Sequence, residues 1–285
     1  MVKEDSETER SHWFYRHSTL VRVTHWVNVI CLTALLMSGL QIFNAHPALY
    51  GGNASDFKRP VLEMKADYDE NKDQTIGVTT IFGRAFNTTG VLGLSSVDGE
   101  PVERGFPSWI TLPGYQDLAV GRRWHFFFAW LFVFNGLVYL ASGFYNGHFR
   151  RDLVPRWQQW RHIGRSIIDH LRLRFPKGEE ARRYNILQQL AYLLVVFFLL
   201  PVMVLAGLTL SPAIDAAVPG LVGLFGGRQS ARTIHFIVAN ALVLFVLVHV
   251  IMVLLSGVWN NLRSMITGWY DIETPSETHE SDSSN

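Results

Sequence analysis

Hydrophobic positions along the chain gather into four long runs that contain no Asp, Glu, Lys or Arg. Polar segments separate these runs, which cover Val23–Phe43, Trp124–Gly147, Asn185–Ile214 and Thr233–Leu262. Each run is long enough for the ~20 residues with which a helix crosses a hydrocarbon core about 30 Å thick. The pattern predicts four transmembrane helices, at about 20–43, 123–147, 187–211 and 232–257.

The predicted fold is an all-α integral membrane protein, a four-helix bundle that occupies residues 1–270. The first apolar run starts about twenty residues from the N-terminus, is longer than the apolar part of a signal peptide, and has no well-placed cleavage site of small residues. We therefore expect it to remain in the protein as a membrane anchor. The single cysteine, Cys31, lies in this run and indicates nothing about disulfides.

Charge is distributed unevenly although the net charge is only +1. The segment His148–Tyr184 carries ten Lys/Arg and four Asp/Glu, whereas Asn44–Gly121 carries six and ten. Positive charge near membrane spans stays on the cytoplasmic side. We expect both termini and His148–Tyr184 to be cytoplasmic, and Asn44–Gly121 to be periplasmic, in a bacterial cytoplasmic (inner) membrane.

Three segments outside the spans differ in kind. Residues 155–175 place Trp and Ile at spacings of three and four among arginines, which predicts an amphipathic helix in the cytoplasmic headgroup region. The tail, 271–285, is rich in Ser, Glu and Asp, and we expect it to be disordered. The insertion 44–121 has too few apolar residues for a core of its own, so we expect it to pack on the membrane face or on a partner.

The fourth run contains two histidines fourteen residues apart, His235 and His249. On an α-helix this spacing separates them by about 21 Å along the axis and leaves them within roughly 40° of one face. One face of one span therefore offers an imidazole near each surface of the membrane.

Two other spans supply a histidine at each of these depths. With alternating span directions, His125 of the second span lies at the periplasmic depth of His235, and His25 of the first span lies at the cytoplasmic depth of His249. Ionisable side chains inside a membrane are rare and usually functional. Two facing imidazoles fit the axial positions of a haem among apolar side chains. The pairing predicts two haems, held by His125 with His235 and by His25 with His249.

Other interpretations are weaker. Each histidine could be a packing residue, but four at paired depths are hard to explain in that way. A His-based ion transporter is a functional alternative of another class, although such a pathway usually adds Asp or Glu, which these span interiors lack. Gly39 follows His25 by fourteen residues and could leave room for a macrocycle at the periplasmic depth.

The histidines stand in motifs that resemble a known family. Arg22-Val-Thr-His25-Trp26, Ser38-Gly39, His125-Phe-Phe-Phe-Ala-Trp130 and the pair His235/His249 are similar to those of bacterial cytochrome b561 and nickel-hydrogenase cytochrome b subunits. The resemblance covers about residues 16–270. It implies a four-helix protein with two non-covalent haem b groups, ligated by these four histidines, that exchanges electrons with quinone.

Versions with a long periplasmic loop resemble membrane anchors of thiosulfate reductase and of periplasmic molybdopterin oxidoreductases. The resemblance therefore implies electron transfer between the quinone pool and a periplasmic redox protein. A self-contained quinol oxidoreductase of the small cytochrome b561 type is the alternative. We expect an electron-transfer subunit rather than a substrate-converting enzyme, because the chain shows no nucleophile, C-x-x-C or phosphate-loop motif.

The remaining expectations concern ligands and partners. Arg122, Arg123 and Arg232 lie at the periplasmic depth and could pair with haem propionates, although interface anchoring explains any one of them as well. The expected partners are the lipid bilayer, quinone and a periplasmic redox protein, with no nucleic acid. We expect quinone on the cytoplasmic side, near Arg16, His17, Asn28 and His148. We expect protein docking on the insertion, anchored by the aromatics of Gly105–Pro113, and the alternative is that the insertion is a lid that shields the periplasmic haem from water.

Overall fold

The computed structural model describes residues 13–161, 163–171, 185–218 and 220–271. These residues are mostly helical, and four helices are long and apolar enough to cross a membrane. The first is α1 (Thr19–Asn44), the second is α2 (Leu118–Tyr145) and the fourth is α9 (Arg228–Leu255). The third covers Ile186–Thr209. The prediction of four helices with the length and hydropathy of membrane spans is confirmed.

Two spans begin earlier than the apolar pattern predicts. α2 starts at Leu118 and includes Arg122 and Arg123, while α9 starts at Arg228. When a span is defined as a run without charged residues, its predicted start falls after the last arginine, even where the helix begins before it. Helices nevertheless continue through arginines near a membrane surface, because the long aliphatic stems let the guanidinium groups reach the water.

The third span is not a uniform α-helix. It consists of α5 (Ile186–Leu194), a π-helical turn η4 (Val195–Leu199) and α6 (Leu200–Thr209). Pro201 follows the wide turn immediately. Proline has no N–H and its ring crowds the preceding turn, so the hydrogen-bond register changes where the proline enters the helix.

The chain divides into two compact units. A central unit contains Thr24–Ala141 and Leu194–Phe245, and a terminal unit contains Met1–Val23, Ser142–Leu193 and Val246–Asn285. Helices α1, α2 and α9 run from one unit into the other.

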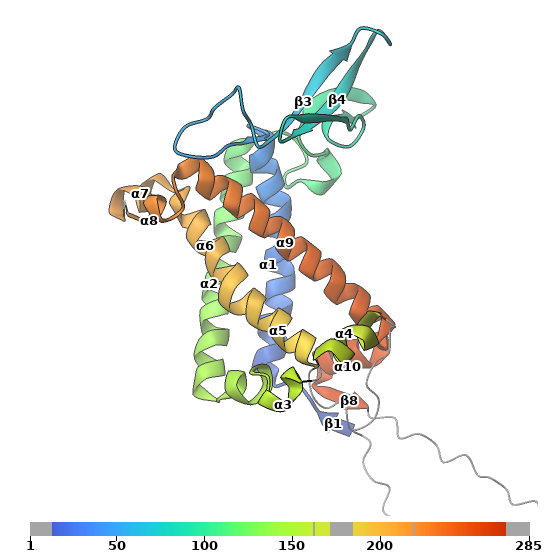
Figure 1. Ribbon diagram of the computed structural model, residues 1–285, viewed down its shortest axis with the longest axis vertical. Coiled ribbons are helices and arrows are strands. Elements are labelled where there is room, and N and C mark those ends of the chain that lie inside the picture. The colour runs from blue at the N-terminus through green and yellow to red at the C-terminus, as the bar shows by residue number, and fades with distance from the viewer. Residues whose placement is uncertain (1–12, 162, 172–184, 219, 272–285) are drawn as a thin grey trace, which may run out of the picture. The chain divides into compact units, whose positions relative to one another are not determined.

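In the central unit, the helices pack through small residues. Cys31, Ala34 and Ser38 of α1 are almost fully buried, as are Ala206 of α6 and Ala231 of α9. Small side chains let membrane helices approach closely. A separate apolar cluster joins η4 to α9 through Val195, Val238 and Leu242. Two short helices, α7 (Pro212–Ala217) and α8 (Gly220–Leu224), lie between α6 and α9 in the chain (Figure 1).

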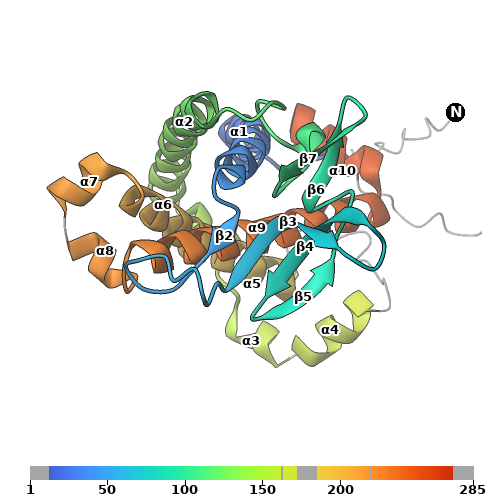
Figure 2. The same ribbon diagram turned by 90° about the horizontal axis from the view of Figure 1, so that it is seen from above.

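The prediction of an all-α protein is wrong for the insertion 44–121, which contains β-structure. Strands β2 (Ala48–Leu49), β3 (Leu62–Asp69), β4 (Gln74–Ile81) and β5 (Arg84–Asn87) form an antiparallel sheet in that order. Strands β6 (Gly93–Val97) and β7 (Glu100–Arg104) form a separate hairpin (Figure 2). A 3-10 turn, η1 (Ser108–Ile110), follows before α2.

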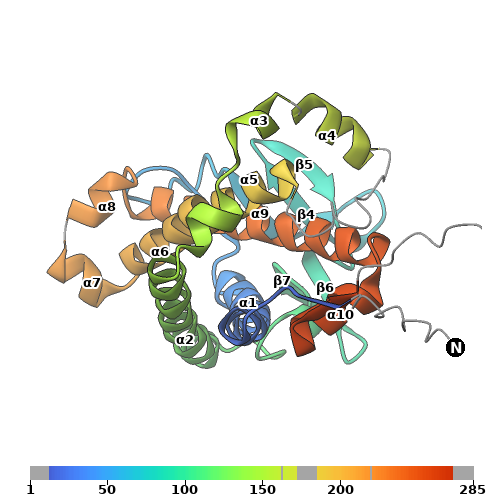
Figure 3. The ribbon, with the colours of Figure 1, turned by 90° about the horizontal axis from the view of Figure 1, so that it is seen from below.

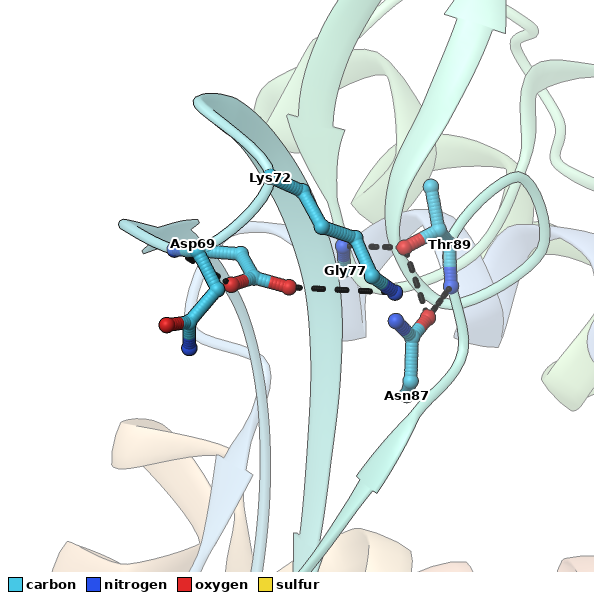
Figure 4. A network of polar contacts seen from close by, with 6 residues as sticks. Asp69, Lys72, Gly77, Asn87 and Thr89 are labelled. Atoms are coloured by element: carbon cyan, nitrogen blue, oxygen red, sulfur yellow. Dashed lines mark hydrogen bonds and ion pairs between the residues drawn. The ribbon is translucent and has the colours of Figure 1, made fainter.

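The β6–β7 hairpin packs tightly on β3 and β4 because two glycines permit it. A Cβ atom on Gly77 would lie 2.4 Å from the carbonyl oxygen of Leu92, and one on Gly93 would lie 2.5 Å from that of Lys65. Side-chain bonds hold the neighbouring turns (Figure 4): the Gly77 N–H donates to the Thr89 hydroxyl, which donates in turn to the Asn87 side-chain oxygen. At the far turn, Lys72 pairs with Asp69.

The hydrophobic core of the insertion is shared with the ends of two spans. Leu49 and Met64 of the sheet are buried against Phe43 of α1. The Phe43 ring stacks on Phe236 of α9, with 4.9 Å between the ring centroids. The helices therefore supply the apolar surface that the insertion itself lacks.

In the terminal unit, strand β1 (Trp13–Tyr15) pairs with β8 (Trp269–Asp271), and α10 (Val258–Thr267) directly precedes β8. Asp271 is thus part of a strand rather than of the expected tail, and 272–285 lie outside the described residues. Helices α3 (Trp157–Trp160) and α4 (Ile163–Leu171) cover part of the predicted amphipathic segment (Figure 3). Residues 162 and 172–175 of that segment lie outside the described residues.

Candidate functional site

Two of the four predicted ligands come together in the central unit. His125 of α2 and His235 of α9 have their ring centroids 6.3 Å apart, with an angle of 66° between the ring planes. Two imidazoles that bind one metal ion from opposite sides, each through a nitrogen about 2 Å from the metal, have their centres about 6 Å apart. The separation therefore suits a single metal ion between the rings.

The Nδ1 atom of His125 forms a hydrogen bond with a side chain of the neighbouring helix α1. It lies 3.1 Å from the hydroxyl oxygen of Ser38 in α1. That hydroxyl donates its own hydrogen to the carbonyl oxygen of Ala34, at 2.6 Å. The Ser38 oxygen consequently accepts, His125 Nδ1 donates, and Nε2 keeps a free lone pair.

His235 is held in the same way by the third span. Its Nδ1 atom lies 3.0 Å from the carbonyl oxygen of Met203 in α6. A carbonyl can only accept, so Nδ1 carries the hydrogen and Nε2 again keeps its lone pair. This is the tautomer in which histidine coordinates a metal through Nε2, while a second bond fixes the orientation of the ring.

Two glycines stand beside the two rings. A Cβ atom on Gly39 of α1 would lie 3.4 Å from Cε1 of His125, and one on Gly207 of α6 would lie 3.1 Å from Cε1 of His235. The absence of a side chain at these two positions lets each imidazole pack directly against the backbone of a neighbouring helix. Two imidazoles held in this way, each with a free Nε2 lone pair, are a donor set that fits a haem iron.

The other predicted pair is divided between the units. His25 lies in the part of α1 that belongs to the central unit, and its ring makes an edge contact with Trp26 at 5.5 Å. His249 lies in the part of α9 that belongs to the terminal unit. That these two histidines bind one haem stays a prediction.

The backbone next to His25 is anchored by a buried amide in α2. The Asn135 side chain donates to the Thr24 carbonyl at 2.9 Å and to the Asn28 side-chain oxygen at 2.8 Å. Asn28 was predicted to lie near a quinone, but its side-chain oxygen serves this helix contact. Interhelical bonds of this kind hold membrane helices together.

The three arginines proposed for haem propionates have different surroundings. Arg232 donates to the His46 carbonyl at 2.6 Å and lies over the Phe43 ring, so it supports the start of the insertion. Arg122 lies over the ring of Phe126 in its own helix, and Arg123 is exposed at the start of α2. That any of the three binds a haem propionate stays a prediction.

Sequence reasoning missed the contribution of the third span. That span contains no histidine, yet it provides Gly207 and the Met203 carbonyl to the site. A backbone carbonyl leaves no mark in a sequence. Gly207 could have been found as a small residue near the predicted periplasmic end of that span, at the depth of His235.

His46 just outside α1 shows that burial near this site suppresses charge. Burial lowers the pKa of His46, the nearby Arg232 guanidinium lowers it further, and Glu63 opposes this. The ring stacks on Tyr50, with 5.7 Å between the centroids, and its Nε2 atom is buried without a hydrogen-bond partner. His46 is thus expected to be neutral at pH 7.

Two half-buried imidazoles from different apolar helices, each with Nδ1 engaged and Nε2 available, indicate a membrane haem protein. The chain belongs to the prokaryotic cytochrome b561 family, whose model matches residues 16–268. It is also similar to a protein of Azospira oryzae named "Putative protein-methionine-sulfoxide reductase subunit YedZ1". The two are 31% identical over 252 residues, which cover 88% of this chain and 96% of that protein. The chain is a multi-pass membrane cytochrome, and its family implies electron transfer.

Proposed function

We propose that this chain carries electrons across the membrane between quinone and a periplasmic redox protein, through two non-covalent b haems. The observation that supports this most strongly is the His125–His235 pair, with 6.3 Å between the ring centroids and both Nδ1 atoms engaged. With both axial positions taken by histidine, a haem supplies reversible one-electron transfer and has no open site for oxygen chemistry.

The second haem is proposed at His25 and His249. His249 stands fourteen residues after His235 in one uninterrupted helix, α9, which places the two imidazoles about 21 Å apart along the axis. Asn135 fixes the backbone of α1 at the neighbouring Thr24. Two haems spaced in this way would connect the two surfaces of the bilayer.

The proposed orientation places both termini in the cytoplasm of a bacterial inner membrane and the insertion in the periplasm. The basic excess of His148–Tyr184 supports it, because positive charge remains on the cytoplasmic side. Quinone would bind on the cytoplasmic side, where Arg16, His17 and His148 offer polar groups near the proposed His25–His249 haem. Quinone reaches such a site laterally from the lipid.

The insertion is proposed as the docking surface for a periplasmic reductase, such as a molybdopterin oxidoreductase. The relative in Azospira oryzae bears the name of a reductase subunit, which supports this class of partner. The β3–β4 hairpin carries Asp67, Asp69, Glu70 and Asp73, and Tyr68 is 56% exposed beside them. An acidic patch would complement a basic partner and make association sensitive to salt.

Haem assays test the electron-transfer proposal. Purified protein should give a reduced-minus-oxidised spectrum of b type, and a pyridine haemochrome assay should return two haems per chain that acid acetone extracts. One haem per chain, or a haem that resists extraction, would contradict the proposal.

Shortening the hairpin tests the docking surface. Ala66 and Gly77 are cross-strand partners, so Asp67–Ile76 can be replaced by Asn-Gly, which makes a tight two-residue turn. The variant should keep both haems and their potentials but lose salt-sensitive electron delivery to the partner purified from the same membranes. Glu100→Gln on the other hairpin is the control. Unchanged delivery, or loss of haem, would refute docking at this hairpin.

A further inference from the structure

The end of the insertion returns into the helical part of the central unit before α2 begins. The N–H of Leu112 donates to the carbonyl oxygen of Met37 in α1, at 3.1 Å. Met37 lies about two turns, roughly 10 Å, before α1 ends at Asn44. The next residue along α1 is Ser38, which holds His125. Segment Phe106–Tyr115 therefore reaches the depth of the His125–His235 pair.

Side chains of α1 bond backbone polar groups at both ends of this segment. Asn44 bonds both the N–H and the carbonyl of Phe106, at 2.7 and 3.1 Å. The Gln41 side chain donates to the Tyr115 carbonyl at 2.9 Å. Both amides are buried and belong to the last turn of α1.

One buried arginine bonds further polar groups of the segment. Arg104, at the end of β7, is only 2% exposed. It donates to the carbonyls of Phe106 and Gly114 and to the hydroxyl of Thr111. Non-helical backbone is tolerated at membrane depth only where the protein itself supplies its hydrogen bonds. Asn44, Gln41 and Arg104 supply such bonds to Phe106, Thr111, Gly114 and Tyr115 of this segment.

The outward side of the segment is aromatic. Trp109 in η1 is 76% exposed and lies within one turn of Leu112, and Tyr115 is 63% exposed. Exposed Trp and Tyr at this height are typical of the belt where acyl chains meet headgroups. In contrast, the β3–β4 hairpin extends away from α1 (Figure 1).

We propose that Phe106–Tyr115 is a re-entrant loop in the outer leaflet of the bilayer, with the Trp109 indole in contact with lipid at the boundary between acyl chains and headgroups. This assigns to lipid the aromatic stretch that sequence reasoning assigned to a protein partner. The loop anchors the β-structured insertion to the membrane surface beside the His125–His235 site. The proposal does not depend on the quinone or on the identity of any partner.

Site-directed spin labelling in lipid vesicles tests the loop. The sole cysteine, Cys31, is first replaced in C31A, and a nitroxide is attached in W109C, in Y68C or in F127C. Tyr68 is 56% exposed on the hairpin and serves as the aqueous control. Phe127 is 64% exposed within α2 and serves as the lipid control. Accessibility is measured with oxygen, which concentrates in lipid, and with a nickel chelate, which stays in water.

The label at position 109 should favour oxygen over the nickel chelate, as the label at 127 does, whereas the label at 68 should favour the chelate. A chelate-accessible label at 109 would overturn the proposal and return the loop to the aqueous surface. If W109C does not fold, tryptophan fluorescence of the wild type and W109F is compared in vesicles with brominated acyl chains. The difference between the two spectra is the Trp109 emission, and brominated lipid should quench it. Quenching of the Trp109 emission by aqueous iodide alone would overturn the proposal.

Discussion

Ser38 and the Met203 carbonyl each accept a hydrogen bond from one nitrogen of a half-buried histidine, and this leaves the other nitrogen free to bind a metal. Because both Nδ1 atoms donate, both Nε2 atoms are available as neutral ligands at a distance that suits one iron between them. Second bonds of this type matter almost as much as the ligands, since they orient the ring and raise its basicity.

Replacing Ser38 by alanine should weaken haem retention without removing a ligand. Loss of the bond to His125 Nδ1 should lower haem affinity by roughly tenfold or more, measured as faster transfer of haem to apomyoglobin. Thr33→Ala is the matched control, because the Thr33 hydroxyl bonds back to Val29 of the same helix and does not contact His125. Equal transfer rates in the two variants would argue against the Ser38 assignment.

Gly207→Val should remove the haem held by His125 and His235 more completely than Gly207→Ala does. The first added carbon already lies 3.1 Å from His235 Cε1, so a branched side chain must displace the imidazole. Gly136→Val in α2 is the control, since a Cβ atom there has no neighbour within 4 Å. Haem content per chain is the readout. If Gly207→Val and Gly136→Val retain the same haem content, haem binding does not require a glycine beside His235.

The histidines could be predicted from sequence because they are rare, polar and regularly spaced within apolar helices. Their partners could not. Ser38 is one of several hydroxyl residues in the spans, and the Met203 carbonyl is backbone. The bond from the Arg232 guanidinium to the His46 carbonyl could not be predicted from sequence either, because its acceptor is also backbone.

At the scale of elements, the insertion is a sheet and a hairpin whose hydrophobic core includes side chains from two of the spans. Phe43 and Phe236 lie in spans far from each other in sequence, and both pack with the sheet. Counting apolar residues within 44–121 therefore underestimates the core, and the β-structure was missed. The spans were easier to predict, because a helix in lipid satisfies its own backbone and must be apolar throughout.

Gly77→Val should destabilise the insertion while leaving the haems in place. A Cβ atom at Gly77 would lie 2.4 Å from the Leu92 carbonyl, so the β6–β7 hairpin would have to move, at a cost of about 1–3 kcal/mol. Protease cleavage within the insertion, measured on intact vesicles, should become faster. Gly51→Val is the control, because a Cβ atom there meets nothing within 4 Å. Equal cleavage of both variants would refute the packing described for Gly77.

At the scale of the whole molecule, α9 is the single helix that carries one histidine for each proposed haem. His235 belongs to a pair that the central unit brings together, and His249 continues the same helix into the terminal unit. Family membership supports haem binding and electron transfer. The number of haems and the pairing of ligands are the central claim that remains to be measured.

A redox titration of single-histidine variants tests this claim most directly. H125A and H235A should each retain one haem and lose the same spectral component, while H25A and H249A should lose the other. Optical spectra recorded at fixed potentials separate the two components in each variant. If H125A and H235A lost different components, or if H25A and H235A lost the same one, the proposed pairing would be contradicted.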